Sequence, residues 1–308
     1  MLCATAARGW GADWLRAQLI EPMLAGEPPF VLSDACPGDW LPLPMVLRLQ
    51  DVSDPSQRKV LKQARWLNRQ DFLDARAGRC PPPERWLPDP FQIDSRRHNT
   101  LGRHSDSSLD EGGLFTREEV FFSASSFSND LPASFSLYAS VANPNALDLL
   151  LDLLHELALT GFGADAATGR GQFSLEPDPT PEPDLEAAPP DSNALISLST
   201  FQPAPGNPTE GAWEAFPRFG KLGPDLGVHD VRKHTLILLR PGACFVSLQR
   251  APFLGHALPM NHILPLATCA ELQNRSVEVI HPAFGLVVPA MIRQNGQFAT
   301  LTHSEDLR

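Results

Sequence analysis

The sequence is short of cysteine, tyrosine and long apolar runs, and these shortages exclude several classes of protein. The 5 cysteines among the 308 residues lie singly, with no Cys-x-x-Cys pair. Neither a zinc site nor a disulfide framework is therefore indicated, and a reducing cytoplasm fits. No apolar run is long enough to cross a bilayer, and the N-terminus lacks the pattern of a secretory signal. We expect a cytoplasmic protein with no metal, no cofactor and no membrane contact.

Basic residues are also scarce for a nucleic-acid binder. The chain has 25 lysines and arginines against 36 aspartates and glutamates, which gives a net charge of -11. A free-standing nucleic-acid binder normally shows its basic footprint in the total charge. Any RNA contact must therefore be local, or shared with partner proteins.

Nucleotide-binding motifs are absent, although glycines cluster in TGFGADAATGRGQF at residues 160–173. A Rossmann site needs a strand before the glycines, but residues 144–160 carry leucines at helical spacing, with Asn143 as N-cap and Gly161 as the left-handed stop. No Gly-Lys-Ser or Gly-Lys-Thr follows, which excludes a P-loop. Residues 171–177 alternate like a strand. The loop thus joins a helix to a strand, and it either follows a nucleic-acid backbone through its bare amides or shapes a surface turn.

Prolines are abundant, at 31, and they predict many loops and short elements. The acidic, proline-rich stretch at residues 177–192 is too polar to pack, so it is predicted to link two domains, residues 1–176 and 193–308. Residues 78–116 form a second loop-rich region, which is the most basic part of the chain.

The other segments mix helices and strands, which predicts an α+β fold. In the first domain the apolar patterns predict elements in the order helix, strand, strand, helix, strand, at residues 12–26, 29–34, 118–125, 144–160 and 171–177. This is the ferredoxin-like order without its first strand, so we expect a truncated or misassigned start. The second domain is strand-rich, with predicted strands at residues 193–201, 234–248 and 283–292, the second interrupted by a turn at Pro241-Gly242.

Four stretches occur in the same order as in one known family. They are GEPPFVLSDACPGDWLPLP at 26–44, RRHNTLGRHSDSSLDEGGLF at 96–115, the glycine-rich loop at 160–171, and HTLILLRPGACF with FGLVVP at 234–245 and 284–289. In these stretches the chain resembles the fourth Csm subunit of type III-A CRISPR effector complexes, in the RAMP superfamily.

The resemblance implies a fold and a role. The fold is two ferredoxin-like, or RRM-like, domains with long loops, and the chain has no nuclease site. The role is that of a ribonucleoprotein subunit in antiviral defence, which holds the 5′ handle of the CRISPR RNA. Such a subunit also docks the large polymerase/cyclase subunit and the backbone RAMP subunits.

The resemblance also implies that residues 78–116 act as a thumb-like loop beside the RNA. Arg97 and Arg103 would hold the handle, and His98 and Asn99 would contact bases. The plain interpretation of these residues is an ordinary solvated loop.

The glycine-rich loop supplies the second set of expected RNA contacts. Four glycines would allow the RNA backbone to approach closely: Gly161, Gly163, Gly169 and Gly171. Thr168 would donate a hydrogen bond to phosphate, and Arg170 would pair with phosphate or stack on a base.

Two other functions stay open. A metal-independent CRISPR RNA-processing endoribonuclease of the same superfamily would use a histidine with a tyrosine or lysine. However, His155 lies on the polar face of the predicted helix, and Tyr138 is the single tyrosine of the chain. A protein-only scaffold would suit the acidic total and the proline-rich segments.

Two acidic patterns are interpreted without metal chemistry. His229-Asp230 resembles part of an HD phosphohydrolase site, but the pair leads directly into a predicted strand, so we interpret it as a turn. Glu118 and Glu119 are adjacent in a predicted strand and point to opposite faces, so both are interpreted as solvated surface.

Overall fold

A computed structural model describes most of the chain and gives an α+β fold, as predicted. The described residues are 2–49, 61–99, 114–122, 134–163, 166, 169–176, 179–223, 226–228, 230–292 and 299–300.

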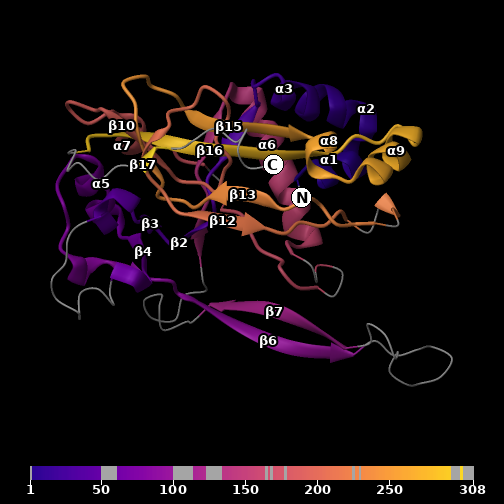
Figure 1. The fold of residues 1–308 in the computed structure, drawn as a ribbon, viewed down its shortest axis with the longest axis horizontal. Coiled ribbons are helices and arrows are strands. Elements are labelled where there is room, and N and C mark those ends of the chain that lie inside the picture. The colour runs from indigo at the N-terminus through magenta and orange to yellow at the C-terminus, as the bar shows by residue number, and fades with distance from the viewer. Residues whose placement is uncertain are drawn as a thin grey trace.

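A six-stranded antiparallel sheet forms the centre of the molecule (Figure 1). Its order is β15-β16-β10-β14-β11-β17. The strands are β10 (Ala194–Ser197), β11 (Glu210–Ala212), β14 (Cys244–Val246), β15 (Phe253–Pro259), β16 (Ile280–Ala290) and β17 (Ala299–Thr300). The strand-rich second half is therefore confirmed, and the predicted turn at Pro241-Gly242 separates β13 (Leu236–Leu239) from β14.

Smaller strand pairs surround the central sheet. β12 (Ala215–Arg218) pairs with β13, and β1 (Phe30–Leu32) pairs with β9 (Ala139–Val141). The remaining short strands form two further sheets, β2 (Cys36–Pro37) with β8 (Phe135–Ser136), and β3 (Leu41–Pro42) with β4 (Ala64–Leu67) and β5 (Leu87–Pro88).

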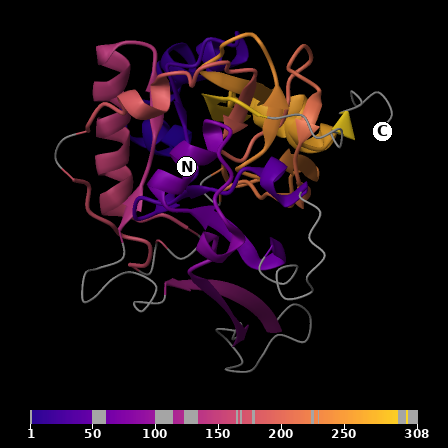
Figure 2. The same cartoon turned by 90° about the vertical axis from the view of Figure 1, so that its left-hand side faces the viewer.

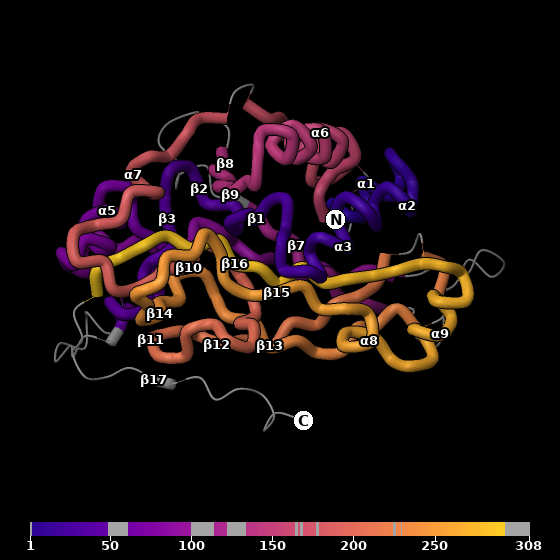
Figure 3. Tube along the Cα trace, turned by 90° about the horizontal axis from the view of Figure 1, so that it is seen from above, coloured from indigo at the N-terminus to yellow at the C-terminus, as the bar shows by residue number. Residues whose placement is uncertain are grey.

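The α-helices are α1 (Leu2–Trp10), α2 (Ala12–Leu15), α3 (Glu21–Leu24), α5 (Arg69–Arg76), α6 (Pro144–Thr160), α7 (Pro183–Glu186), α8 (Met260–Ile263) and α9 (Leu266–Asn274). Helices α1, α2, α6 and α7 lie on one side of the central sheet, and the β12–β13 ribbon lies on the other, together with helices α8 and α9 (Figure 3). A π-helix, η1 (Arg16–Ile20), joins α2 to α3, and two short 3₁₀ turns are η2 (Met45–Leu49) and η3 (Pro83–Arg85). Among the described helices, none combines the length and apolar character that a bilayer crossing requires.

The helix α6 forms where its local signals predict it. The Asn143 side chain accepts a hydrogen bond from the Ala146 amide at 3.0 Å, as an N-cap does. At the other end, Gly161 has a φ of 85°, which only glycine adopts without strain. The leucines at helical spacing face the core, with Leu150, Leu153 and Leu157 buried.

The strand predicted at residues 171–177 is not present: the described residues of this segment, 171–176, form no strand. The Phe162 amide donates to the Gly171 carbonyl at 2.8 Å, so the chain closes back on the glycine-rich loop. A hydrogen-bonding group that a strand would offer to a neighbour is therefore used locally.

Side chains at residues 32–34 connect β1 to the central sheet. Both oxygens of Asp34 accept hydrogen bonds from Thr200, from its amide at 3.0 Å and its hydroxyl at 2.6 Å. The Ser199 hydroxyl donates to the Leu32 carbonyl at 2.7 Å and accepts from the Leu286 amide at 2.8 Å. The two halves of the chain are thus joined here by side-chain bonds and by a backbone bond from the Asp34 amide to the Leu198 carbonyl at 3.1 Å, although no ladder pairs β1 with β16 among the described residues.

The described part of the proline-rich segment at residues 177–192 packs against the rest, contrary to the prediction that it is too polar to do so. It forms α7, and Leu185 is buried in the main core. The buried Arg76 guanidinium donates to four main-chain oxygens, those of Asp184, Leu185, Ala187 and Pro289. Hydrogen bonds from the Arg76 guanidinium thus hold the backbone of this segment in place, although the segment has few apolar side chains to bury. The main core contains residues from both sides of the segment, and the division into two domains stays a prediction.

We expect Arg76→Met to lower the free energy of unfolding by about 3 kcal/mol, because it leaves buried carbonyls without a donor. Urea unfolding followed by circular dichroism measures this. Arg79→Ala is the control, since Arg79 is exposed and pairs only with Asp74 in the described structure; a surface pair of this kind contributes about 0–1 kcal/mol. Equal losses for the two variants would contradict the role of Arg76.

Candidate nucleic-acid interface

A long β-hairpin projects from the rest of the molecule (Figure 2). It consists of β6 (Phe91–Asn99) and β7 (Leu114–Phe122), nine residues each, paired antiparallel. Residues 78–116 were predicted to be loop, and the structure places a strand at 91–99 instead. Cross-strand pairing with β7 supplies the backbone hydrogen bonds that the polar sequence of β6 does not predict.

The two faces of the hairpin carry different side chains, because successive residues of a strand point to opposite sides. One face combines Gln92, Asp94, Arg96 and His98 with Phe115, Arg117, Glu119 and Phe121. The other face combines Ile93, Ser95, Arg97 and Asn99 with Leu114, Thr116, Glu118 and Val120. The expected RNA contacts Arg97 and His98 therefore lie on opposite faces of the hairpin.

Cations and aromatic rings alternate on the first face. The Arg96 guanidinium lies 5.5 Å from the centre of the Phe121 ring, and the Arg117 guanidinium lies 5.3 Å from that of Phe115. The His98 ring stacks on Phe115 with centroids 5.4 Å apart. Guanidinium and aromatic planes stack on unpaired bases in many RNA-binding proteins, so this face carries side chains of the kinds that can contact single-stranded RNA. Phe115, Arg117 and Phe121 occupy alternate positions in LFTREEVFF. This spacing places them on one face of a strand, but it indicates a binding face only when the partner strand β6 is known.

Glu119 joins the hairpin to the glycine-rich loop. Its carboxylate lies 2.6 Å from the Arg170 guanidinium and 3.2 Å from Nε of Arg96, and its side chain is 8% exposed. Glu118 is exposed, so the prediction of opposite faces holds but that of two solvated carboxylates is wrong for Glu119. Two cations from different segments compensate the buried charge.

The glycine-rich loop closes on itself. Gly161, Gly163, Gly169 and Gly171 all have positive φ. A Cβ on Gly161 would meet the Arg170 carbonyl oxygen, and one on Gly171 would meet that of Phe162. In contrast, among the described atoms nothing lies within 4 Å of a Cβ at Gly163 or Gly169, although the Gly169 amide donates to the Ala166 carbonyl at 3.0 Å. Two of the glycines therefore shape the turn by close contact, and the other two have open space beside them.

Not every expected contact can be placed. Arg103 and Thr168 lie outside the described residues. Arg97 is exposed on the hairpin, and Asn99 lies at the end of β6. The structure thus brings Arg170 to the hairpin through Glu119, while Arg97 lies on the other face from that contact.

The residues considered for the endoribonuclease and for the HD-type site make local contacts in the described structure. Nδ1 of the exposed His155 lies 2.8 Å from the Leu151 carbonyl of its own helix. Burial raises the pKa of Tyr138, which disfavours its use as a base at neutral pH. Asp230 accepts a hydrogen bond from the Arg232 amide at 3.0 Å, as in a turn. Across the part of the chain that the structure describes, no three His, Cys, Asp or Glu side chains group to hold a metal.

Two solved structures are similar to this chain over nearly its whole length. One is the Csm3-Csm4 subcomplex in the type III-A CRISPR-Cas interference complex, of which a chain matches with a TM-score of 0.58 and 10% identity, covering 94% of this chain and 91% of that chain. The other is the Csm1-Csm4 cassette in complex with AMPPNP, with a TM-score of 0.48 and 15% identity, covering 96% and 90%. No protein-family model matches the sequence, and no curated protein matches it. The first likeness shows that this chain shares the fold of a chain in that subcomplex, which is the fold that the resemblance in the sequence implies.

We expect Gly171→Ala to disrupt the loop and Gly163→Ala to be milder. Both variants place a side chain at positive φ, which costs about 1 kcal/mol, but only the first also forces Cβ against a carbonyl oxygen. Hydrogen exchange of the amides in residues 161–172 measures the loss, since the Phe162 amide is protected only in the closed loop. Similar protection in both variants would show that Gly171 does not hold the turn.

Proposed function

We propose that this chain is a non-catalytic RNA-binding subunit of a type III-A CRISPR effector complex, with the role of the fourth Csm subunit. It holds the 5′ handle of the CRISPR RNA and docks the large polymerase/cyclase subunit and the backbone RAMP subunits, in the cytoplasm. We assign it two ferredoxin-like domains, one on each side of the proline-rich segment. The observation that carries the proposal is the coincidence of a RAMP-complex fold with a hairpin that alternates cations and aromatic rings.

The hairpin binds RNA by stacking and by charge. Bases stack on the Phe115 and Phe121 rings, and the guanidiniums over those rings add cation–π attraction. Arg97, exposed on the second face, pairs with phosphate. A single strand that passes round the hairpin contacts both faces.

The glycine-rich loop presents backbone amides beside the hairpin. Gly163 and Gly169 have open surroundings, but the Gly169 amide already donates to the Ala166 carbonyl, so Gly163 is the position where a phosphate can approach the main chain. Part of the Arg170 guanidinium pairs with Glu119, and its remaining N–H groups are available to donate to a phosphate of the RNA. Its first role is therefore to hold the loop against the hairpin, and phosphate pairing is its second.

A protein-only scaffold is the second candidate, because the second face of the hairpin exposes three large apolar side chains. Leu114 is 75% exposed, Ile93 67% and Val120 55%. Exposed apolar side chains of this size favour a protein partner. In this case the hairpin would insert into a neighbouring subunit without touching RNA.

The test is retention of CRISPR RNA by the complex purified with its neighbouring gene products. We expect Arg97→Ala to lower retention as salt rises and to reduce the slope of log affinity against log salt by about 0.7, the value for one phosphate contact on a single strand. Arg79→Ala, which removes the same charge from an exposed site paired with Asp74, is the control and should change neither quantity. If both variants retain RNA like the unchanged complex, the scaffold candidate is favoured.

A further inference from the structure

A second strand ribbon carries its own group of cations. Beyond the β12–β13 pairing, the ribbon continues through a bridge between Lys221 and Arg232 and through a 3.0 Å hydrogen bond from the Lys233 amide to the Gly220 carbonyl. We call four basic residues of this ribbon and one aromatic residue the ribbon strip: Arg218, Phe219, Lys221, Arg232 and Lys233.

The four cations of the ribbon strip have no carboxylate partner within ion-pair distance among the described side chains. In contrast, Arg240 and Arg48 at the base of the ribbon both pair with Glu214.

Like charges lie close together at the inner end of the ribbon strip. Burial lowers the pKa of Lys233, an effect that Cys3 partly offsets and that the charge of Arg218 reinforces. Burial, Lys233 and Arg218 together lower the pKa of His281, on β16 beneath the ribbon, to about 4. The Asp34 carboxylate, which accepts hydrogen bonds from Thr200, attracts Arg218 and offsets part of this positive charge. The repulsion between Lys233, Arg218 and His281 remains, and a bound anion would relieve it.

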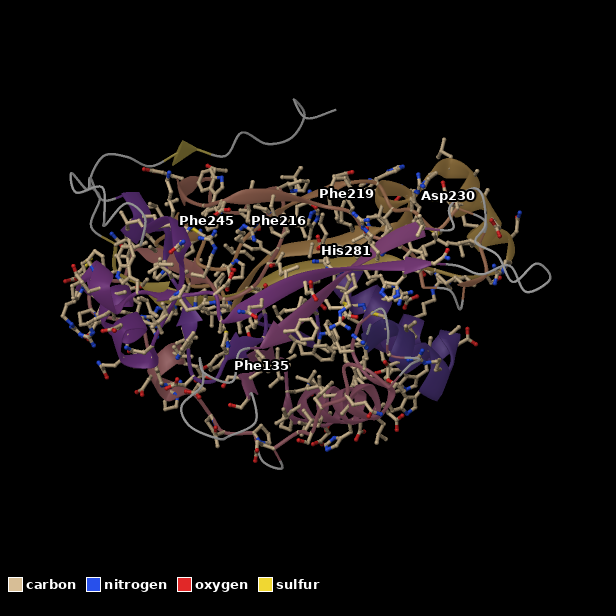
Figure 4. All side chains as sticks on the ribbon, turned by 90° about the horizontal axis from the view of Figure 1, so that it is seen from below. Phe135, Phe216, Phe219, Asp230, Phe245 and His281 are labelled. Carbon is tan, nitrogen blue, oxygen red and sulfur yellow. The ribbon has the colours of Figure 1, made fainter. Side chains whose placement is uncertain are left out.

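An exposed aromatic ring lies within this positive group. Phe219 is 78% exposed, although an apolar ring of this size gains by burial. It lies two residues before Lys221, and in an extended ribbon side chains two residues apart share a face, so an anionic chain held by Lys221 passes the ring. In the view of Figure 4, Phe219 and His281 lie near each other, and the β6–β7 hairpin crosses the view beside His281.

We propose that the ribbon strip is a second binding site for single-stranded RNA, in which Arg218, Lys221 and Lys233 hold phosphates and Phe219 stacks on an unpaired base. Cations that follow a backbone beside a free aromatic face are the arrangement that binds single strands with little sequence preference. An acidic peptide would satisfy the cations but would not use the ring in this way. The site deepens the proposed function, because the same RNA would run from the hairpin to the ribbon.

The experiment is fluorescence anisotropy of the full chain with a 5′-labelled, mixed-sequence single-stranded RNA of about 20 nucleotides, a length that covers more than one site of the size typical for such folds. We expect Phe219→Ala to weaken binding at least about fivefold, the lower limit for the loss of one stacked base. Lys221→Ala should reduce the salt slope by about 0.7. Both side chains are exposed, so thermal unfolding should match that of the unchanged chain.

Two controls separate this site from the hairpin. Arg79→Ala removes an exposed cation elsewhere and should leave binding unchanged, and Arg97→Ala reports on the hairpin alone. If Arg97→Ala weakens binding while the two ribbon variants do not, the ribbon proposal is overturned and the proposed function stands. If the ribbon variants weaken binding while Arg97→Ala does not, the ribbon site stands and the hairpin contact fails. Unchanged binding in all variants overturns both.

A second readout does not depend on affinity. A phosphate beside Lys233 favours the charged form of His281, so RNA should raise the pKa of that imidazole in an NMR titration. An unchanged pKa of His281 at saturating RNA would overturn the site.

A protein contact at the same place would also overturn the ribbon proposal. It would be seen if Phe219→Ala or Lys221→Ala released a neighbouring protein subunit from the complex but left RNA binding unchanged.

Discussion

The buried polar junction between β1 and the central sheet is the contact on which the arrangement of the two halves depends. Burial raises the pKa of Asp34, and the two hydrogen bonds from Thr200, followed by the charge of Arg218, offset part of that rise. Ser199 completes the junction by bonding to the backbone of β1 and of β16 at once. Such side-chain bonds are directional, and together with the backbone bond from the Asp34 amide to the Leu198 carbonyl they fix how the first half sits on the sheet. Leu32, Asp34 and the residues around them belong to the stretch in which the family resemblance begins.

The second constraint is electrostatic and concerns the candidate interface. Glu119 brings Arg96 and Arg170 together, so a carboxylate in the middle of the hairpin also sets the position of the glycine-rich loop. A net charge of -11 is compatible with RNA binding only if cations are concentrated where RNA lies. The hairpin and the ribbon strip are two such concentrations, and both include exposed aromatic rings. The acidic remainder is available for contact with basic surfaces of partner subunits.

The sequence predicts what local signals specify and fails where distant residues decide. Helix α6 is confirmed from cap to cap because Asn143 and Gly161 act within one turn of its ends. Strand β6 is missed because it carries Arg, His and Asn where a strand usually has apolar residues, and only its partner β7 supports it. The proline-rich segment looks unable to pack because the donor that orders it, Arg76, is more than a hundred residues away. The pairing of Glu119 with Arg170 likewise has no local signal in the sequence. The position of the candidate site could therefore be found only from the three-dimensional structure.

The most direct measurement is RNA–protein crosslinking with mass spectrometry on the chain purified with its neighbouring gene products. It identifies which peptides attach to which nucleotides, so it tests RNA contact and the identity of the RNA together. The account predicts crosslinks from residues 91–99 and 114–122 to the 5′ handle of a CRISPR RNA. Co-purification of the chain with a CRISPR RNA complex, without any crosslinked peptide from this chain, would contradict it and identify the chain as a protein-only scaffold.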